Sequence, residues 1–306
     1  MTRADADRLL ALGRQAKLTG EDADGWAKRL DPERSALREA VEWLAANGEV
    51  DAGVELAAAV WRLWHRSGAI AEGRALLAAA LDRPGAPTAA RSRALYADGL
   101  LAFRAGDQAR SQARNEEALR VAREIGDPES EALALVGLSR VALRAGEYDS
   151  VCRLAEEALR VTRDLERDAQ VMPLHLLAAG TRLSGDYPRA TTLYKDSLTL
   201  NRGLRDLGMV RTELHNLGHV SLHLGDVAAA VQYFGECSEL RRGSENPYDR
   251  AMELLNGAAL AYHRGETERT ADRVAEVEST LNRAGIVLDP DDRFEVDWLR
   301  EQLAAK

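Results

Sequence analysis

A glycine recurs along this chain at a nearly constant interval, and that interval constrains the fold more than any other feature. The successive steps are 38, 40, 39, 40 and 40 residues, counted over Gly68, Gly106, Gly146, Gly185, Gly225 and Gly265. A fixed period of roughly 20–50 residues is the signature of repeat architectures, in which each unit packs on the next. Glycine often ends a helix in the left-handed conformation. Each of these positions is therefore predicted to be the turn inside one helix pair.

The residues around each glycine predict two helices and no strand. Alanine, leucine, arginine and glutamate dominate and favour helix, and period-two runs of β-branched residues are missing. Seven residues before the glycine the side chain is usually small, as at Gly99 and Gly218, so paired helices are expected to approach closely. Pro128 and Pro247 suit the first turn of a helix. We predict an all-α protein of six pairs, at residues 51–82, 91–124, 129–163, 168–202, 208–242 and 248–284.

These features together resemble the tetratricopeptide repeat. The turn glycine is matched in every repeat, and the Ala-Leu pair of the second helix is present as Ala80-Leu81, Ala118-Leu119 and Ala158-Leu159. The interval exceeds the usual tetratricopeptide period of about 34 residues, which implies longer helices, as in the variant found in bacterial sensor proteins. The resemblance implies a right-handed solenoid whose concave surface is lined by the first helix of each pair.

Both ends of the sequence extend this resemblance to one group of regulators. The segment from Trp26 to Leu30, with Trp43 and the run from Val54 to Trp64, resembles the start of the helical sensor arm of STAND-class signal-transduction ATPases. Residues 285–293 resemble the end of that arm. The sequence contains neither the phosphate-binding loop of the ATPase nor the DNA-binding part of those regulators. The resemblance therefore implies a sensor or regulator and names no activity.

The segments outside the repeats are expected to cap the solenoid, because terminal repeats need a polar outer face. Residues 1–50 are predicted to form N-terminal capping helices, and residues 286–306 a C-terminal capping helix. Phe294 and Trp298 lie four residues apart, on one side of that helix, and are expected to pack back on the sixth pair.

Charge and cysteine usage narrow the range of partners. The chain has 306 residues, a net charge of −9 and a pI near 5.3, which argues against direct binding of nucleic acid or of an acidic membrane. Cys152 and Cys237 are not spaced as metal ligands or as a disulfide framework. No apolar segment approaches the roughly 20 residues of a membrane span. We expect a cytoplasmic protein without a cofactor, whose partner is a protein or peptide and which can form a homodimer.

The candidate ligand-binding residues are polar side chains that the spacing places on the concave side of the first helices. All six histidines of the chain fall on columns counted back from the turn glycines. Arginines fill the same columns in the early repeats. The predicted binding set is Arg62, Arg66, Arg93, Tyr96, Arg104, Arg140, Arg144, His175, Arg182, His215, Asn216, His219, His223, Asn256, Tyr262 and His263.

This set predicts a groove for an acidic peptide segment or a small anion, since arginine forks match carboxylates and phosphates. The asparagines are expected to hold the main chain of an extended peptide. The arginines have an alternative interpretation without a ligand, in which they lie along the surface and pair with nearby acids. Trp61 and Trp64 are better explained by packing than by ligand stacking. Histidines should make anion binding stronger as the pH falls from about 8 to about 6.

A metal site and an enzyme are the rival interpretations of the histidines. His215 and His219 have chelating spacing on one helix, but His223 is about 12 Å from His215 along the axis, and no nearby carboxylate is evident. Signatures of catalysis are absent, so no catalytic residue and no metal ligand is predicted. The sequence thus favours a non-catalytic binding or regulatory protein. A metalloprotein or enzyme that uses the histidines, and an adaptor that binds partners on its convex face, stay as alternatives.

Overall fold

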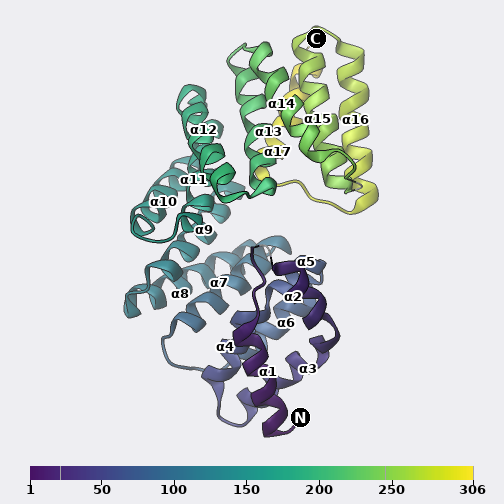
Figure 1. Cartoon of the computed structure of the whole chain (residues 1–306). Coiled ribbons are helices and arrows are strands. Elements are labelled where there is room, and N and C mark those ends of the chain that lie inside the picture. The colour runs from purple at the N-terminus through teal and green to yellow at the C-terminus, as the bar shows by residue number, and fades with distance from the viewer. Residues whose placement is uncertain (21, 245, 306) are drawn as a thin grey trace. The chain divides into compact units, whose positions relative to one another are not determined.

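The computed structural model describes residues 1–20, 22–244 and 246–305. Over these residues the chain is built from helices and turns, with no strand (Figure 1). It divides into two compact units, each of which is described by itself. Unit 1 comprises residues 1–141 with 160–164, and unit 2 comprises residues 142–159 with 165–306. None of the described helices is both long enough and apolar enough to cross a membrane.

Unit 1 holds the N-terminal helices and the first repeats. Its elements are α1 (Arg3–Gln15), α2 (Ala23–Leu30), the short 3-10 helix η1 (Asp31–Glu33), α3 (Arg34–Ala46), α4 (Val50–Val60), α5 (Arg62–Ser67), α6 (Ile70–Leu81), α7 (Ala89–Arg104), α8 (Gln108–Ile125) and most of α9 (Pro128–Ala145). The helix predicted before Gly68 is interrupted at Trp61, which separates α4 from α5.

Unit 2 holds the remaining repeats and the C-terminal helix. Its elements are most of α10 (Tyr148–Val161), the short 3-10 helix η2 (Arg167–Gln170), α11 (Val171–Leu183), α12 (Tyr187–Leu204), α13 (Leu207–His223), α14 (Val227–Arg241), α15 (Pro247–His263), α16 (Thr267–Ala284) and α17 (Pro290–Ala304).

The six turn glycines behave as the period predicts. All six have a positive φ, between 74° and 88°, which side chains other than glycine rarely adopt. Between α13 and α14, Gly225 ends the first helix, and the Asp226 side chain accepts a hydrogen bond from the backbone N–H of Ala229 at 2.9 Å. That cap satisfies one of the free N–H groups at the start of the next helix. The predicted helix starts at Pro128 and Pro247 are also confirmed.

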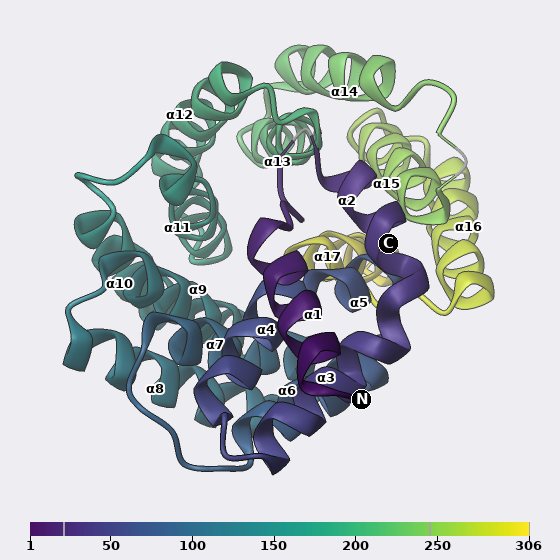
Figure 2. The ribbon, with the colours of Figure 1, turned by 60° about the horizontal axis from the view of Figure 1, so that its bottom comes forward.

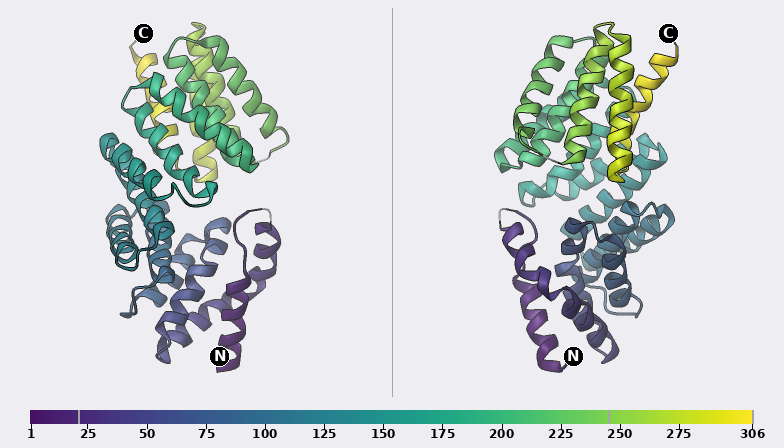
Figure 3. Two further views of the ribbon diagram at one scale, coloured as in Figure 1. Left: turned by 60° about the vertical axis from the view of Figure 1, so that its left-hand side comes forward. Right: turned by 90° about the vertical axis from the view of Figure 1, so that its right-hand side faces the viewer.

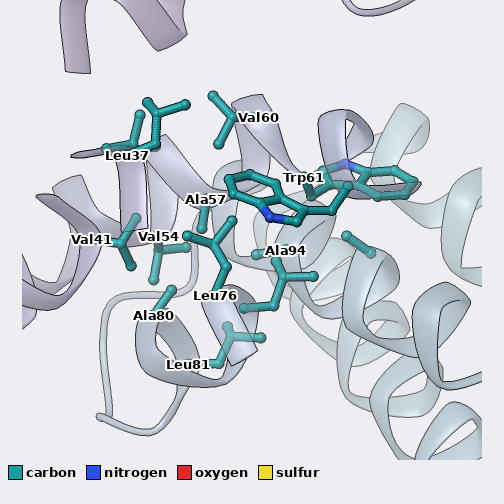
Figure 4. Close-up of a cluster of buried hydrophobic side chains, with 14 of the residues drawn as sticks. Leu37, Val41, Val54, Ala57, Val60, Trp61, Leu76, Ala80, Leu81 and Ala94 are labelled. Carbon is teal, nitrogen blue, oxygen red and sulfur yellow. The ribbon is translucent and has the colours of Figure 1, made fainter. Parts of the chain in front are cut away.

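An aliphatic core fills unit 1, and the two tryptophans of the first pair belong to it (Figure 4). Trp61 and Trp64 are almost fully buried, at 3% and 2% exposure. Leu37 and Val41 of α3 pack into the same cluster as Leu76 of α6. The packing interpretation of the tryptophans is therefore confirmed. The helices before the first repeat are joined to it by this shared core.

In unit 2 the antiparallel pairs α11/α12, α13/α14 and α15/α16 stand in a row (Figure 3). The first helix of each pair lies on the inner side, and α17 lies within the arc of α11, α13 and α15 (Figure 2). Val296 and Leu299 of α17 join the apolar core of the last repeats. Helix α17 also contacts α11, two pairs back from the sixth pair on which the sequence places it. It reaches α11 because Arg182 of that helix donates hydrogen bonds to Glu295 and Asp291 of α17.

Gly218 marks the tightest approach inside a helix pair of unit 2. A Cβ atom at this position would lie 2.1 Å from Cε1 of Phe234, on α14. We expect Gly218→Leu to lower the free energy of unfolding by about 1–3 kcal/mol through overpacking, as measured by urea denaturation.

The matched control is Gly235→Leu, because a Cβ there would have no neighbour within 4 Å. Gly235 lies inside α14, where leucine is the better helix former, so this change should leave stability equal or slightly higher. Equal losses at the two positions would show that helix approach does not explain the small residue at Gly218.

Candidate functional site

Polar side chains gather on the inner helices of each unit, and the two groups differ in what they contact. The group in unit 2 is called the histidine surface. It consists of Arg182 on α11, His215, His219 and His223 on α13, and His263 on α15. The three histidines of α13 follow one another at intervals of four residues, which places them along one side of that helix. The sequence predicts an open hollow in front of them, and this is wrong because α17 occupies that space.

Glu295 of α17 is the centre of the contacts on the histidine surface. Arg182 donates from Nη1 to Glu295 Oε1 at 3.2 Å. His219 Nδ1 lies 3.4 Å and His223 Nε2 lies 3.1 Å from Glu295 Oε2. The carboxylate is 2% exposed. One buried anion is thus surrounded by three cationic or ionisable side chains from two inner helices.

Asp292 and Asp291 lie one turn earlier on α17. Asp292 Oδ1 is 3.1 Å from His215 Nε2, and the hydroxyl of Tyr248 on α15 donates to the same carboxylate. Arg182 donates to the backbone carbonyl of Asp291 at 3.0 Å and lies 3.9 Å from its carboxylate. Both aspartates are buried. The first turn of α17 is therefore held by charge and hydrogen bonds from three helices, α11, α13 and α15.

The carboxylates titrate differently because their surroundings differ. Burial alone would raise the pKa of Glu295, but His219, His223 and Arg182 outweigh it and hold this pKa well below its ordinary value. Burial likewise opposes ionisation of Asp292, yet its partners His215 and Tyr248 lower its pKa to about 2. Burial and the neighbouring Asp292 raise the pKa of Asp291. Glu295 and Asp292 therefore stabilise the docked helix above about pH 4.5, the ordinary range for these acids, and lose that effect as the pH falls further.

Two other predicted residues, Asn256 and Tyr262, support this surface, and His263 contacts α17 directly. His219 Nε2 is 3.2 Å from the Asn256 amide oxygen, so Asn256 orients a histidine. The Tyr262 hydroxyl donates to Gln302 of α17, and the His263 ring stacks on Trp298 with the ring centroids 6.0 Å apart.

The remaining two predicted residues of α11 and α13 are His175, which is half-buried, and Asn216, which is buried. His175 pairs with Glu213 at 3.1 Å, and Glu213 accepts from Ser197 at 2.7 Å. Asn216 is 1% exposed, and its amide atoms make no hydrogen bond to the described residues.

The acidic face of α17 is the part of the site that sequence reasoning missed. Asp292, Glu295, Val296 and Leu299 follow a helical i, i+3, i+4, i+7 pattern, so two acids occupy the stripe where a capping helix needs apolar residues. The sequence pattern predicts inward packing for Phe294 and Trp298 only. The sequence does contain a signal for this contact. Two acids lie within the apolar stripe of α17, and the histidines on the concave columns have no predicted partner.

The group in unit 1 is called the arginine cluster and consists of Arg62, His65, Arg66, Arg104 and Arg140. These residues come from α5, α7 and α9. Arg140 donates to the Tyr96 hydroxyl at 3.2 Å, and the Arg62 guanidinium lies over the Trp61 ring, 4.6 Å from its centroid. Arg66 pairs with Asp24. Within the described chain, neither Arg62 nor Arg140 forms an ion pair with a carboxylate, in contrast to Arg182 of the histidine surface.

The charges in the arginine cluster act on one another. Burial and the positive charges of Arg104, Arg140, Arg62 and Arg66 lower the pKa of His65 from 6.5 to about 4. Burial also lowers the pKa of Arg62, against the field of Tyr96 and Glu129, and the charge of Arg93 adds to the lowering. His65 is therefore neutral at pH 7, although the sequence counts it among the groove histidines. An anion at this position would reverse these effects.

Arg144 belongs to unit 2, where it lines a cavity of about 560 Å³. The other residues that line this cavity include Tyr148 on α10 and Arg293, Phe294 and Trp298 on α17.

Among the described residues, no group of three or more histidine, cysteine, aspartate or glutamate side chains is arranged to hold a metal ion. Cys237 is buried and Cys152 partly buried, and both are free thiols.

Comparison with known proteins identifies the fold. Neither a protein-family model nor a curated protein sequence matches the chain. The structure is similar to a Rap protein complexed with competence and sporulation factor, with 13% identity over 97% of this chain and 79% of that one and a TM-score of 0.65. It is also similar to NprR complexed with its cognate peptide NprX, with 15% identity over 97% of this chain and 82% of that one and a TM-score of 0.59.

A third similar structure is a STAND protein with a tetratricopeptide-repeat sensor from Pyrococcus horikoshii. Its TM-score is 0.60 and its identity 14%, over 92% of this chain and 46% of that one. A tetratricopeptide-repeat protein from Parabacteroides merdae matches 97% of this chain and 99% of its own length, with 14% identity and a TM-score of 0.59. The chain therefore has the tetratricopeptide-repeat fold, as its glycine period predicts.

Proposed function

We propose that the protein is a non-catalytic regulator that recognises an acidic peptide segment of a partner through the arginine cluster of unit 1. The observation that carries this proposal is the contrast between the two units. On the histidine surface, buried cationic and ionisable side chains are matched by carboxylates of α17. In the arginine cluster, Arg62 and Arg140 have no such match within the described chain, so an acidic segment would supply the carboxylates they lack.

The chemistry of the cluster suits a peptide carboxylate. Arg140 is fixed by Tyr96 and Arg62 by Trp61, so both guanidinium groups are oriented before a ligand arrives, which reduces the entropy lost on binding. Guanidinium groups bind carboxylates in a planar, bidentate manner. Arg93 on α7 adds a further positive charge beside Arg62.

The comparisons support a peptide ligand over a small metabolite. NprR, which shares the fold, is complexed with a peptide. The arginines come from three successive first helices, a spacing that favours an extended or helical segment over a single small anion. We infer that the partner is a protein or peptide that presents at least two acidic residues to this face.

The expected result is salt-sensitive binding that depends on these arginines. A fluorescein-labelled peptide with alternating Glu and Ala should bind the wild-type protein, and the matched Gln peptide should not. Arg62→Gln with Arg140→Gln should weaken binding by about tenfold or more, since each hydrogen bond to a charged group contributes about 1.5–3 kcal/mol. Affinity should also fall as salt rises from 50 to 300 mM.

The matched control removes two arginines from elsewhere on unit 1. Arg38 and Arg120 are exposed side chains on α3 and α8, so Arg38→Gln with Arg120→Gln removes the same charge from outside the cluster. This variant should bind like the wild type. Equal weakening in the two double variants would mean that net charge alone attracts the peptide, and would overturn the proposed site.

A further inference from the structure

We propose that the histidine surface of unit 2 is a second binding surface, specific for an acidic helix, and that α17 is its tethered occupant. The recognition element is the pair Asp292 and Glu295, one helical turn apart, with Trp298 one turn further. A partner helix that presents the same Asp-x-x-Glu-x-x-Trp face would compete with α17 for Arg182 and the histidines of α13. This inference goes beyond the proposed function, because it concerns other residues in the other unit.

Helix α17 makes two kinds of contact. Some are the apolar contacts of a capping helix, and others are the matched charge contacts of a bound ligand. A capping helix needs an apolar inner side and a polar outer side, and Val296 and Leu299 supply such a side. Capping does not require buried carboxylates, since removing charges from water cancels much of the gain from pairing them. Asp292 and Glu295 nonetheless meet Arg182, His215, His219 and His223 at distances of 3.1–3.4 Å. Such matching provides specificity for acids at those two positions.

The attachment of α17 makes exchange geometrically simple. It follows α16 through a five-residue connection, residues 285–289, which begins at Gly285 with a φ of 63°. In this connection Val287 is 81% exposed, whereas Leu288 is buried in the core of the last repeats. The inner helices α11, α13 and α15 have their own partners in α12, α14 and α16. We therefore expect the repeats to stay folded while α17 leaves.

The partner must be a helix, because the two carboxylates contact different sets of side chains in a fixed register. Asp292 reaches His215 and Tyr248, whereas Glu295 reaches Arg182, His219 and His223. Three residues of helix separate the two acids by about 4.5 Å along the axis. Trp298 then stacks on His263. An extended acidic segment would space the same three groups too widely.

The experiment neutralises the recognition pair in the full chain and follows α17 by hydrogen exchange. In Asp292→Asn with Glu295→Gln, amides of α17 should exchange about tenfold faster or more, while α13 and α15 keep their protection. The control is Asp297→Asn with Glu301→Gln, which removes two charges from the more exposed side of the same helix. It should leave the exchange of α17 unchanged. Equal acceleration in the control, or no acceleration in either variant, would overturn the proposal.

The same variant provides a test of binding in trans. A labelled peptide of residues 286–305 should bind Asp292→Asn with Glu295→Gln, whose surface is vacated, and should bind the wild type at least about tenfold more weakly because of its tethered competitor. A peptide carrying the two neutral substitutions should bind neither protein. If the variant instead loses protection throughout α13 and α15, or fails to bind the acidic peptide, α17 is a structural cap and the inference is wrong. Neither failure bears on the arginine cluster.

Discussion

Replacing Arg182 with methionine is expected to lower the free energy of unfolding of unit 2 by about 3–5 kcal/mol, because it leaves buried carboxylates without their fixed cation. The Arg182 side chain is fully buried and donates to Glu295 and to the carbonyl of Asp291. Arginine keeps its charge at neutral pH, so Arg182 is the fixed cation of this group. Urea denaturation at pH 7, with hydrogen exchange of α11 and α13 to identify unit 2, measures this loss.

Two companion variants decide whether the loss comes from the buried charge. Arg202→Met removes an exposed arginine that pairs with Glu236 on the outer helices, and should cost no more than about 1 kcal/mol. Arg182→Met combined with Glu295→Gln should recover part of the loss, with a coupling of about 1–3 kcal/mol. Additive effects of the two substitutions would mean that Arg182 stabilises the unit by packing alone.

Acidic-peptide binding to the arginine cluster is expected to tighten by about tenfold as the pH falls from 7 to 5, through proton uptake by His65. Four arginines and burial hold the pKa of His65 at about 4, so it is neutral in the free protein throughout this range. A bound carboxylate would favour the imidazolium and raise this pKa toward its ordinary value of 6.5. The complex therefore takes up a proton that the free protein does not hold, and lower pH favours it.

Isothermal titration calorimetry in buffers of different ionisation enthalpy measures this uptake directly. The wild type should gain up to one proton per peptide near pH 5.5, and His65→Gln should gain close to none while retaining binding at pH 7. His263→Gln is the matched control, because His263 belongs to unit 2 and stacks on Trp298. Its proton uptake should equal that of the wild type. Undiminished uptake in His65→Gln would show that another group titrates.

The fold could be predicted from the sequence because each of its signals is local. A glycine with a positive φ must lie where a helix ends, so the six glycines located the turns. Gly218 indicates a close approach of two helices, although the sequence does not show that Phe234 is the neighbour. These features depend only on residues within one helix pair, and the sequence repeats this pair at a nearly fixed interval. The interruption at Trp61 escaped prediction because Trp61 packs into the core together with α6 and α7.

The site could be predicted only in part because its ion pairs join residues that are far apart in the sequence. The columns correctly placed His215, His219, His223 and Arg182 on the inner helices. Their partner Glu295 lies 113 residues beyond Arg182 in the chain, and helical periodicity cannot show which surface a distant helix covers.

Whether an acidic peptide binds at the arginine cluster is tested most directly by mapping where such a peptide contacts the wild-type chain. A Glu-rich peptide carrying a benzophenone next to its acidic residues, cross-linked by light and mapped by mass spectrometry, reports that position. We expect cross-links within α5, α7 and α9, around Arg62, Arg104 and Arg140, and none within α13 while α17 covers the histidine surface. Cross-links confined to the outer helices α6, α8, α12, α14 or α16 would contradict this expectation.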